Sequence, residues 1–243
     1  MRHFQDQLSE LFQKIVQMGS LAESMIQKAV ETLETGQADS RNAVFESERQ
    51  VNALQVQVDD AAVKLTVLQQ PVAGDARFLF MASRIAGELE RIADQAVNIA
   101  QNAGHLTDQP PLPPLVELSL MARIARKMVR DTLSAMIERD VAMANQVLRD
   151  EKQVDAFRDQ IFSSLLGSMA DDPKLIQAAL SLILIARNLE RIGDHATNIA
   201  EEVIYWLQGR DVRHGQARRD EDVEQQAKNE AKHEQSDHSN DRR

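Results

Sequence analysis

The sequence predicts an all-α protein made of two tandem three-helix bundles, six long helices related by internal pseudo-symmetry. Aromatic residues are only 4% of the chain, while aliphatic residues, Glu and Gln dominate, which favours helices packed through aliphatic side chains. Apolar residues recur every three or four positions over long segments, the spacing of an amphipathic helix. The second half also repeats the first with a period of about 100 residues, which indicates an internal duplication.

The first repeat, residues 1–104, contains three predicted helices. Gly36 is suited to the end of the first helix, and Asp39 or Ser40 can supply an N-cap oxygen to the second. Pro71 ends the second helix and suits the opening of the third. The predicted helices span about 4–36, 40–70 and 71–103.

A linker at 105–114 separates the two repeats, because its four prolines within five positions cannot continue a helix. The second repeat, 115–209, follows the same plan, with Asp140 and Asp172 as N-caps of its second and third helices. Its third helix opens with Pro173 and ends near Gly209. The remaining residues, 210–243, are polar and are predicted to form a flexible tail.

Composition excludes several classes of function. The chain has no cysteine, so it has no disulfides and no thiolate metal site, which suits a cytoplasmic protein. A formal net charge of −10 without a clustered basic face argues against a nucleic-acid partner. No stretch approaches the roughly 20 apolar residues that cross a bilayer, so contact with a membrane is expected only through partner proteins.

The residues that could carry chemistry are two Glu-x-x-x-Asp pairs, one in each predicted third helix, at equivalent positions of segments 85–100 and 185–200. A spacing of four places both carboxylates on one helix face, where they repel each other unless a cation offsets the charge. Asn98 and Asn198 extend the two rows. The pairs are Glu90 with Asp94, and Glu190 with Asp194.

The predicted second helices offer matching oxygen donors, Glu48 with Asn52 in the first repeat and Glu151 with Asp155 in the second. If the second and third helices pack side by side, three or four oxygens converge at one level of each bundle. Such sites without cysteine suit Mg, Mn, Ca or Fe, with Zn as a further candidate.

Other interpretations stay open. The carboxylates could be solvated surface groups or could pair with Arg91 and Arg191 of neighbouring helices. A carboxylate-bridged metal enzyme would need helix-borne Glu-x-x-His pairs, and the one such spacing, Glu230 to His233, falls in the predicted tail. His195 is interpreted as a surface residue. No catalytic residue is predicted, and a purely structural scaffold is the third alternative.

The paired motifs resemble the signature of the PhoU family of phosphate-signalling regulators. They are Leu-Glu-Arg-Ile-Ala-Asp at 89–94 and Leu-Glu-Arg-Ile-Gly-Asp-His-Ala-Thr-Asn-Ile at 189–199. Two flanking segments also match, Gln-Pro-Val-Ala-Gly-Asp-Ala-Arg at 70–77 and Gly-Arg-Asp-Val-Arg-His at 209–214. Together the similar segments extend over about residues 4–214.

The resemblance implies a cytoplasmic, non-enzymatic negative regulator that links the Pst phosphate transporter, through its ATPase subunit, to the sensor kinase PhoR and its partner PhoB. It also implies self-association as a homodimer. Family members are described as binding metal clusters on the Glu-x-x-x-Asp faces, here expected to be Fe, Zn, Mg or Mn. Because an amide oxygen is a weaker ligand than a carboxylate, Asn52 is expected to weaken the first site. The implied ligands are Glu48, Glu90, Asp94, Glu151, Asp155, Glu190 and Asp194.

Overall fold

The computed structural model describes residues 2–106, 109 and 116–212, and nearly all of them are helical. The predicted tail beyond Val212 and most of the predicted linker lie outside these residues. The prediction that the tail begins at residue 210 is wrong, because Val212 is buried in the core. The all-α class and the two tandem three-helix bundles are confirmed. The helices are α1 (Arg2–Thr35), α2 (Ala38–Gln69), α3 (Ala73–His105), α4 (Val116–Glu138), α5 (Val141–Asp171), a 3-10 turn η1 (Pro173–Leu175) and α6 (Ile176–Gln208).

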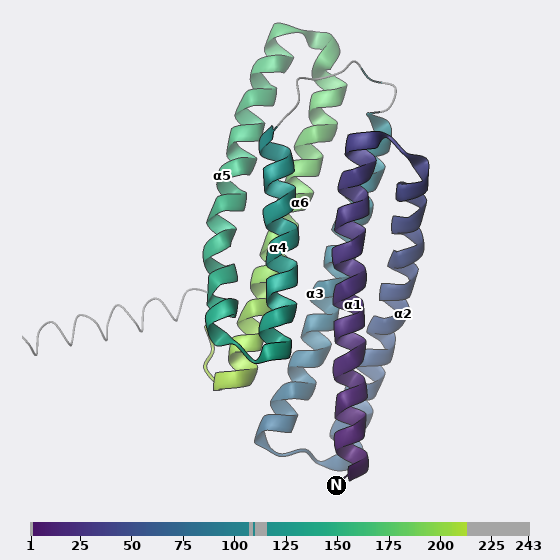
Figure 1. Cartoon of the computed structure of the whole chain (residues 1–243), viewed down its shortest axis with the longest axis vertical. Coiled ribbons are helices and arrows are strands. Elements are labelled where there is room, and N and C mark those ends of the chain that lie inside the picture. The colour runs from purple at the N-terminus through teal and green to yellow at the C-terminus, as the bar shows by residue number, and fades with distance from the viewer. Residues whose placement is uncertain (1, 107–108, 110–115, 213–243) are drawn as a thin grey trace, which may run out of the picture.

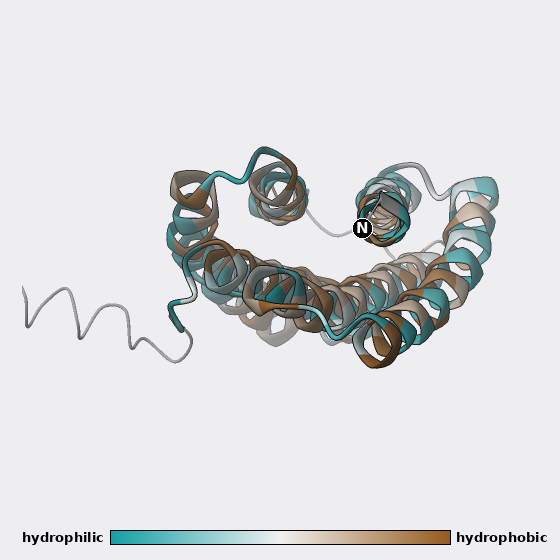
Figure 2. Ribbon diagram, turned by 90° about the horizontal axis from the view of Figure 1, so that it is seen from below, coloured by the Kyte–Doolittle hydropathy of each residue, from teal (hydrophilic) through white to brown (hydrophobic). Residues whose placement is uncertain are grey.

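The helices form two layers (Figures 1 and 2). Helices α2, α3, α6 and α5 lie side by side in a curved row, with α3 against α6 at its centre. Helix α1 covers α2 and α3, while α4 covers α5 and α6, and α1 and α4 touch each other. The contact between α3 and α6 is the most extensive of all helix pairs, so the two motif helices also join the bundles.

The core explains most of the identity between the repeats. Apolar residues at equivalent positions of α3 and α6 are almost completely buried in both halves. Their recurrence is therefore a packing requirement and carries no information on function. None of the described helices is long and apolar enough to span a bilayer. The recurring buried residues include Ile85 and Ile185, Leu89 and Leu189, Ile92 and Ile192, and Ile99 and Ile199.

Most predicted helix ends are confirmed. Asp140 accepts hydrogen bonds from the backbone N–H groups of Ala142 (2.8 Å) and Met143 (3.1 Å). Asp172 caps the 3-10 turn before α6, whereas α6 itself begins after Leu175, so the predicted cap lies one short turn earlier than the helix. Gly209 ends α6 in the left-handed conformation. The predicted N-cap of the second helix is wrong. Helix α2 begins before Asp39, after Gln37, and Asp39 instead places its carboxylate in the first turn, where it favours the positive end of the helix dipole.

Gly19 allows α1 and α4 to approach closely. A Cβ atom added at this buried glycine would lie 2.3 Å from Cδ2 of Leu133 on α4, well inside contact distance. By contrast, exposed Gly167 in α5 has open space where its Cβ would be. A side chain at Gly19 would therefore have to displace Leu133, whereas one at Gly167 would meet no neighbour.

We expect Gly19→Val to lower the free energy of unfolding by about 2 kcal/mol, because the branched side chain must displace Leu133. Gly167→Ala is the matched control and should raise it by about 0.5 to 1 kcal/mol, since alanine loses less backbone entropy in a helix. Urea denaturation measures both. Equal stability of Gly19→Val and the parent protein would contradict the close contact of α1 with α4.

Candidate functional site

The first acidic site lies between α2 and α3. Glu90 is half-buried on α3, Asp94 is exposed one turn further on, and Glu48 faces them from α2. Partial loss of water raises the pKa of Glu90, and the charges of Asp94 and Glu48 add to this effect, while the charge of Arg91 opposes it. The pKa of Asp94 is raised by the same loss of water and by Glu48. The structure thus brings together the carboxylates that the sequence predicted would converge in the first bundle.

No cationic side chain contacts these three carboxylates among the described residues. Arg91 binds Glu88 instead, at 2.6 Å on its own helix. Asn52 donates its amide N–H to Glu48 at 2.7 Å, and its carbonyl oxygen Oδ1 is buried without a hydrogen-bond partner. A buried amide oxygen left unpaired beside mutually repelling carboxylates is a suitable environment for a hard cation.

The second acidic site, between α5 and α6, contains its own cation. Arg158 of α5 forms an ion pair with Glu190 and lies 3.6 Å from Asp155. Its guanidinium also contacts Asp159 at 2.9 Å. Burial raises the pKa of Asp194, as do the charges of Glu190 and Asp155, while Arg158 acts in the opposite direction. The two sites therefore have similar acids but differ in local charge balance.

The origin of this difference can be read from the repeat. The equivalence of segments 48–53 and 151–156 places Gln55 where the second bundle has Arg158. Asn52 is expected to weaken cation binding at the first site, whereas Arg158 occupies part of the second site and would oppose a cation there. In neither bundle do three described Asp, Glu or His side chains already form a coordination shell. The oxygen donors fit a cation in type, and Glu151 is half-buried on α5 near the second set.

Of the polar residues near the two acidic rows, Arg91 and Asn198 have partners outside the carboxylates of their own motifs. Asn198 donates a hydrogen bond to Glu88 at 3.0 Å, across the contact between α6 and α3. The backbone oxygen of Asn98 accepts from the side chain of Asn102. Arg191 is exposed on α6. Neither Arg91 nor Asn198 therefore directly contacts the carboxylates of its own motif.

A polar bridge between α3 and α6 was not predicted from the sequence. Glu88 contacts Nδ1 of His195 at 2.8 Å, so His195 is a half-buried interface residue and its interpretation as a surface group is wrong. Arg84 and Glu202 form a second cross-link at 2.8 Å. Hydrogen bonds from His195 and Asn198 lower the pKa of Glu88 despite the opposing effect of its burial.

The sequence does mark this bridge, because two of its residues stand at positions where the aligned repeats differ. Glu88 stands opposite Asn188 in the alignment, and His195 opposite Gln95. Glu88 of α3 meets His195 and Asn198 of α6, and not its own counterpart Asn188. The divergence at positions 88 and 195 thus gives α3 an acid and α6 a ring nitrogen that contacts it.

We expect Glu88→Gln to lower the free energy of unfolding at pH 7 by about 1 kcal/mol, since a charge-assisted hydrogen bond is lost. The pKa of Glu88 is lower in the folded protein than its ordinary value of 4.5, so the stabilisation is present above that pH. It is lost as the pH falls through the folded-state value. The difference between variant and parent should therefore shrink below about pH 4.5.

Denaturation at several pH values measures this difference. Glu46→Gln on the exposed side of α2 is the control and should leave the pH profile unchanged. A difference between the Glu88 variant and the parent that stays constant from neutral to acid pH would contradict the role of this ionised carboxylate.

Sequence comparison identifies both bundles. The PhoU domain model matches residues 15–103 and 118–203, one match in each repeat. The chain is 32% identical over 211 residues to the phosphate-specific transport system accessory protein PhoU of Escherichia coli, covering 87% of this chain and 88% of that protein. It is 35% identical over 214 residues to the Pseudomonas putida homologue, covering 88% and 84% of the two chains.

The fold agrees with solved structures. PhoU from Pseudomonas aeruginosa superimposes with a TM-score of 0.82 at 32% identity, covering 85% of this chain and all of that chain. The phosphate transport system regulatory protein PhoU from Streptococcus pneumoniae has a TM-score of 0.80 at 23% identity, which supports the fold alone. Two domain matches in tandem, whole-length relatives and a common architecture lead to one conclusion: this chain belongs to the PhoU family.

Proposed function

We propose that this protein is a metal-binding adaptor that represses phosphate uptake and phosphate-starvation signalling when phosphate is plentiful. Its relatives are named as accessory proteins of the phosphate-specific transport system, which supports a role in regulating phosphate transport. In the proposal, the protein acts in the cytoplasm on the ATPase subunit of the Pst transporter and on the sensor kinase PhoR. It acts as a homodimer and without catalytic turnover.

The observation that supports the metal part of the proposal is the first acidic site. Glu48, Glu90 and Asp94 face one another, and within the described part of the chain no cationic side chain contacts them and no donor reaches the buried oxygen of Asn52. A bound Fe, Zn, Mg or Mn ion would neutralise the carboxylates and could engage the amide oxygen. The same face, once neutralised, would be able to approach an acidic partner surface.

In this proposal the second site binds metal more weakly than the first. Arg158 already offsets the charge of Glu190, and a metal ion would have to displace it. The proposal therefore assigns the tighter metal site to the first bundle and a conditional one to the second. The two repeats would then carry sites of different metal affinity.

We expect the double variant Glu90→Gln/Asp94→Asn to bind less metal and, without metal, to be more stable than the parent by a few tenths of a kcal/mol at pH 7. A raised pKa means that the charged form is disfavoured in the folded protein, so the cost exists at neutral pH and disappears as the pH falls. Elemental analysis measures metal content, and thermal unfolding in chelator measures stability.

Arg158→Gln is the matched variant, because it gives the second bundle the residue of the first. It should increase metal content, whereas the double variant should decrease it. Unchanged metal content in both variants would contradict metal binding at these sites, and a metal-free parent protein after incubation with Fe, Zn, Mg and Mn would do the same.

We expect deletion of the gene to derepress phosphate-starvation genes in phosphate-rich medium. The readout is a reporter fused to a starvation-induced promoter, and a plasmid copy of the parent gene is the control. Pull-down from membranes with and without chelator tests the partners: the transporter ATPase subunit and PhoR should be retained, and less so with chelator. Normal repression in the deletion strain would contradict the regulatory role.

The same measurements separate the alternatives. A carboxylate-bridged metal enzyme would bind metal and show turnover of a substrate, while a structural scaffold would bind no metal and would not respond to phosphate. His195, the histidine nearest the second motif, hydrogen-bonds Glu88 across the bundle interface, which gives no support to a metal-ligand role in a di-iron site.

A further inference from the structure

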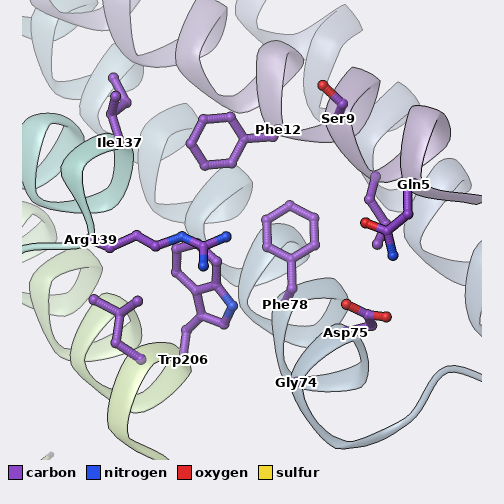
Figure 3. Close-up of a pocket in the computed structure, with 11 residues that line it drawn as sticks. Gln5, Ser9, Phe12, Gly74, Asp75, Phe78, Ile137, Arg139 and Trp206 are labelled. Atoms are coloured by element: carbon purple, nitrogen blue, oxygen red, sulfur yellow. The ribbon is translucent and has the colours of Figure 1, made fainter.

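A cavity lies at the end of the molecule where α3 begins and where α4 and α6 end. The acidic residues Glu90 and Asp94 lie further along α3. Its volume is about 550 Å³, within the usual range for small-ligand sites, and α1 supplies one wall. Figure 3 shows the side chains that line it. The acidic motifs contribute none of them, so the cavity is separate from the site described above.

Aromatic rings form the centre of the cavity lining. The ring centroids of Phe12 and Phe78 are 6.2 Å apart, and those of Phe78 and Trp206 are 5.5 Å apart. The guanidinium carbon of Arg139 lies 5.2 Å from the centre of the Trp206 ring. Such a lining offers ring faces and edges to a flat ligand.

Two opposite charges border the rings without pairing. Figure 3 shows Arg139 and Asp75 on different sides of Phe78, and both line the cavity. Among the described residues, neither forms an ion pair or a side-chain hydrogen bond. The guanidinium retains its N–H donors for an anionic group, and the Asp75 carboxylate can accept hydrogen bonds from N–H or O–H donors.

The backbone at Arg139 is held in an unfavourable conformation. Its φ is 56°, in the left-handed region that favours glycine, and the N–H of Asp140 closes the turn on the oxygen of Ala135. Gly36 and Gly209 end other helices with φ of 69° and 68°. Arginine at this position makes the folded protein less stable than glycine would. The Arg139 side chain lies over the ring of Trp206.

We propose that this cavity binds a nucleoside phosphate. The phosphate would pair with Arg139, the flat base would lie against Phe12 and Phe78, and an amino or hydroxyl group would donate to Asp75. The ligand would thus contact both the Arg139 guanidinium and the Asp75 carboxylate, which line the same cavity. This inference does not depend on the metal-binding or signalling roles proposed above.

Trp206 provides a direct readout, because it is the only tryptophan in the chain. The full-length protein, in chelator-containing buffer without added metal, is titrated with AMP, ADP and ATP while tryptophan fluorescence is followed; calorimetry measures the same binding without an optical signal. We expect a saturable change with at least one nucleotide. Adenosine and inorganic phosphate, each lacking half of the ligand, should bind at least about tenfold more weakly, equivalent to about 1.4 kcal/mol.

Arg139→Asn separates binding from folding, because asparagine tolerates the left-handed conformation. This variant should keep its unfolding temperature and lose at least about tenfold in nucleotide affinity. Arg130→Asn, at an exposed position of α4 outside the cavity, is the control and should bind like the parent. No saturable binding of any nucleotide, or equal affinity of Arg139→Asn and the parent, would overturn the proposal.

Discussion

The structure depends on the contact between α3 and α6. Each of these helices buries an apolar face within its own bundle and also packs along the other, so both must be apolar over much of their circumference. Small residues on both helices, such as Ala86, Ala96, Ala186 and Ala196, are completely or almost completely buried. Because one helix pair forms both the core of each bundle and the interface between the bundles, neither half has a separate core of its own.

This contact also bears on which residues the two repeats share. Apolar side chains are retained in both copies and meet apolar surroundings on each side. Several polar residues at the interface differ between the copies and pair across it: Glu88 has His195 as a partner, and Arg84 has Glu202. Asn198 also contacts Glu88 and is retained in the first repeat as Asn98, so only part of this bridge has diverged.

Further from the interface, the acidic motifs persist in both halves. Their persistence is informative because packing does not explain it: Asp94 and Asp194 are exposed, and their raised pKa values show that the charged forms are unfavourable where they stand. What differs is the second helix of each bundle. A single basic residue, Arg158, contacts the carboxylates of one site, whereas no cationic side chain among the described residues contacts those of the other.

The sequence by itself determined the helix pattern, the duplication, several helix ends and the family, because these features depend on interactions between residues near in the chain or on recurring motifs. Asp140 and Gly209 are examples, since a cap acts on its own helix. Only the tertiary structure decided which charges meet across helices: Arg158 with Glu190, His195 with Glu88, and Arg139 with Trp206. These pairs are separated by tens of residues, and their meeting depends on how the helices pack and rotate, which no local pattern specifies.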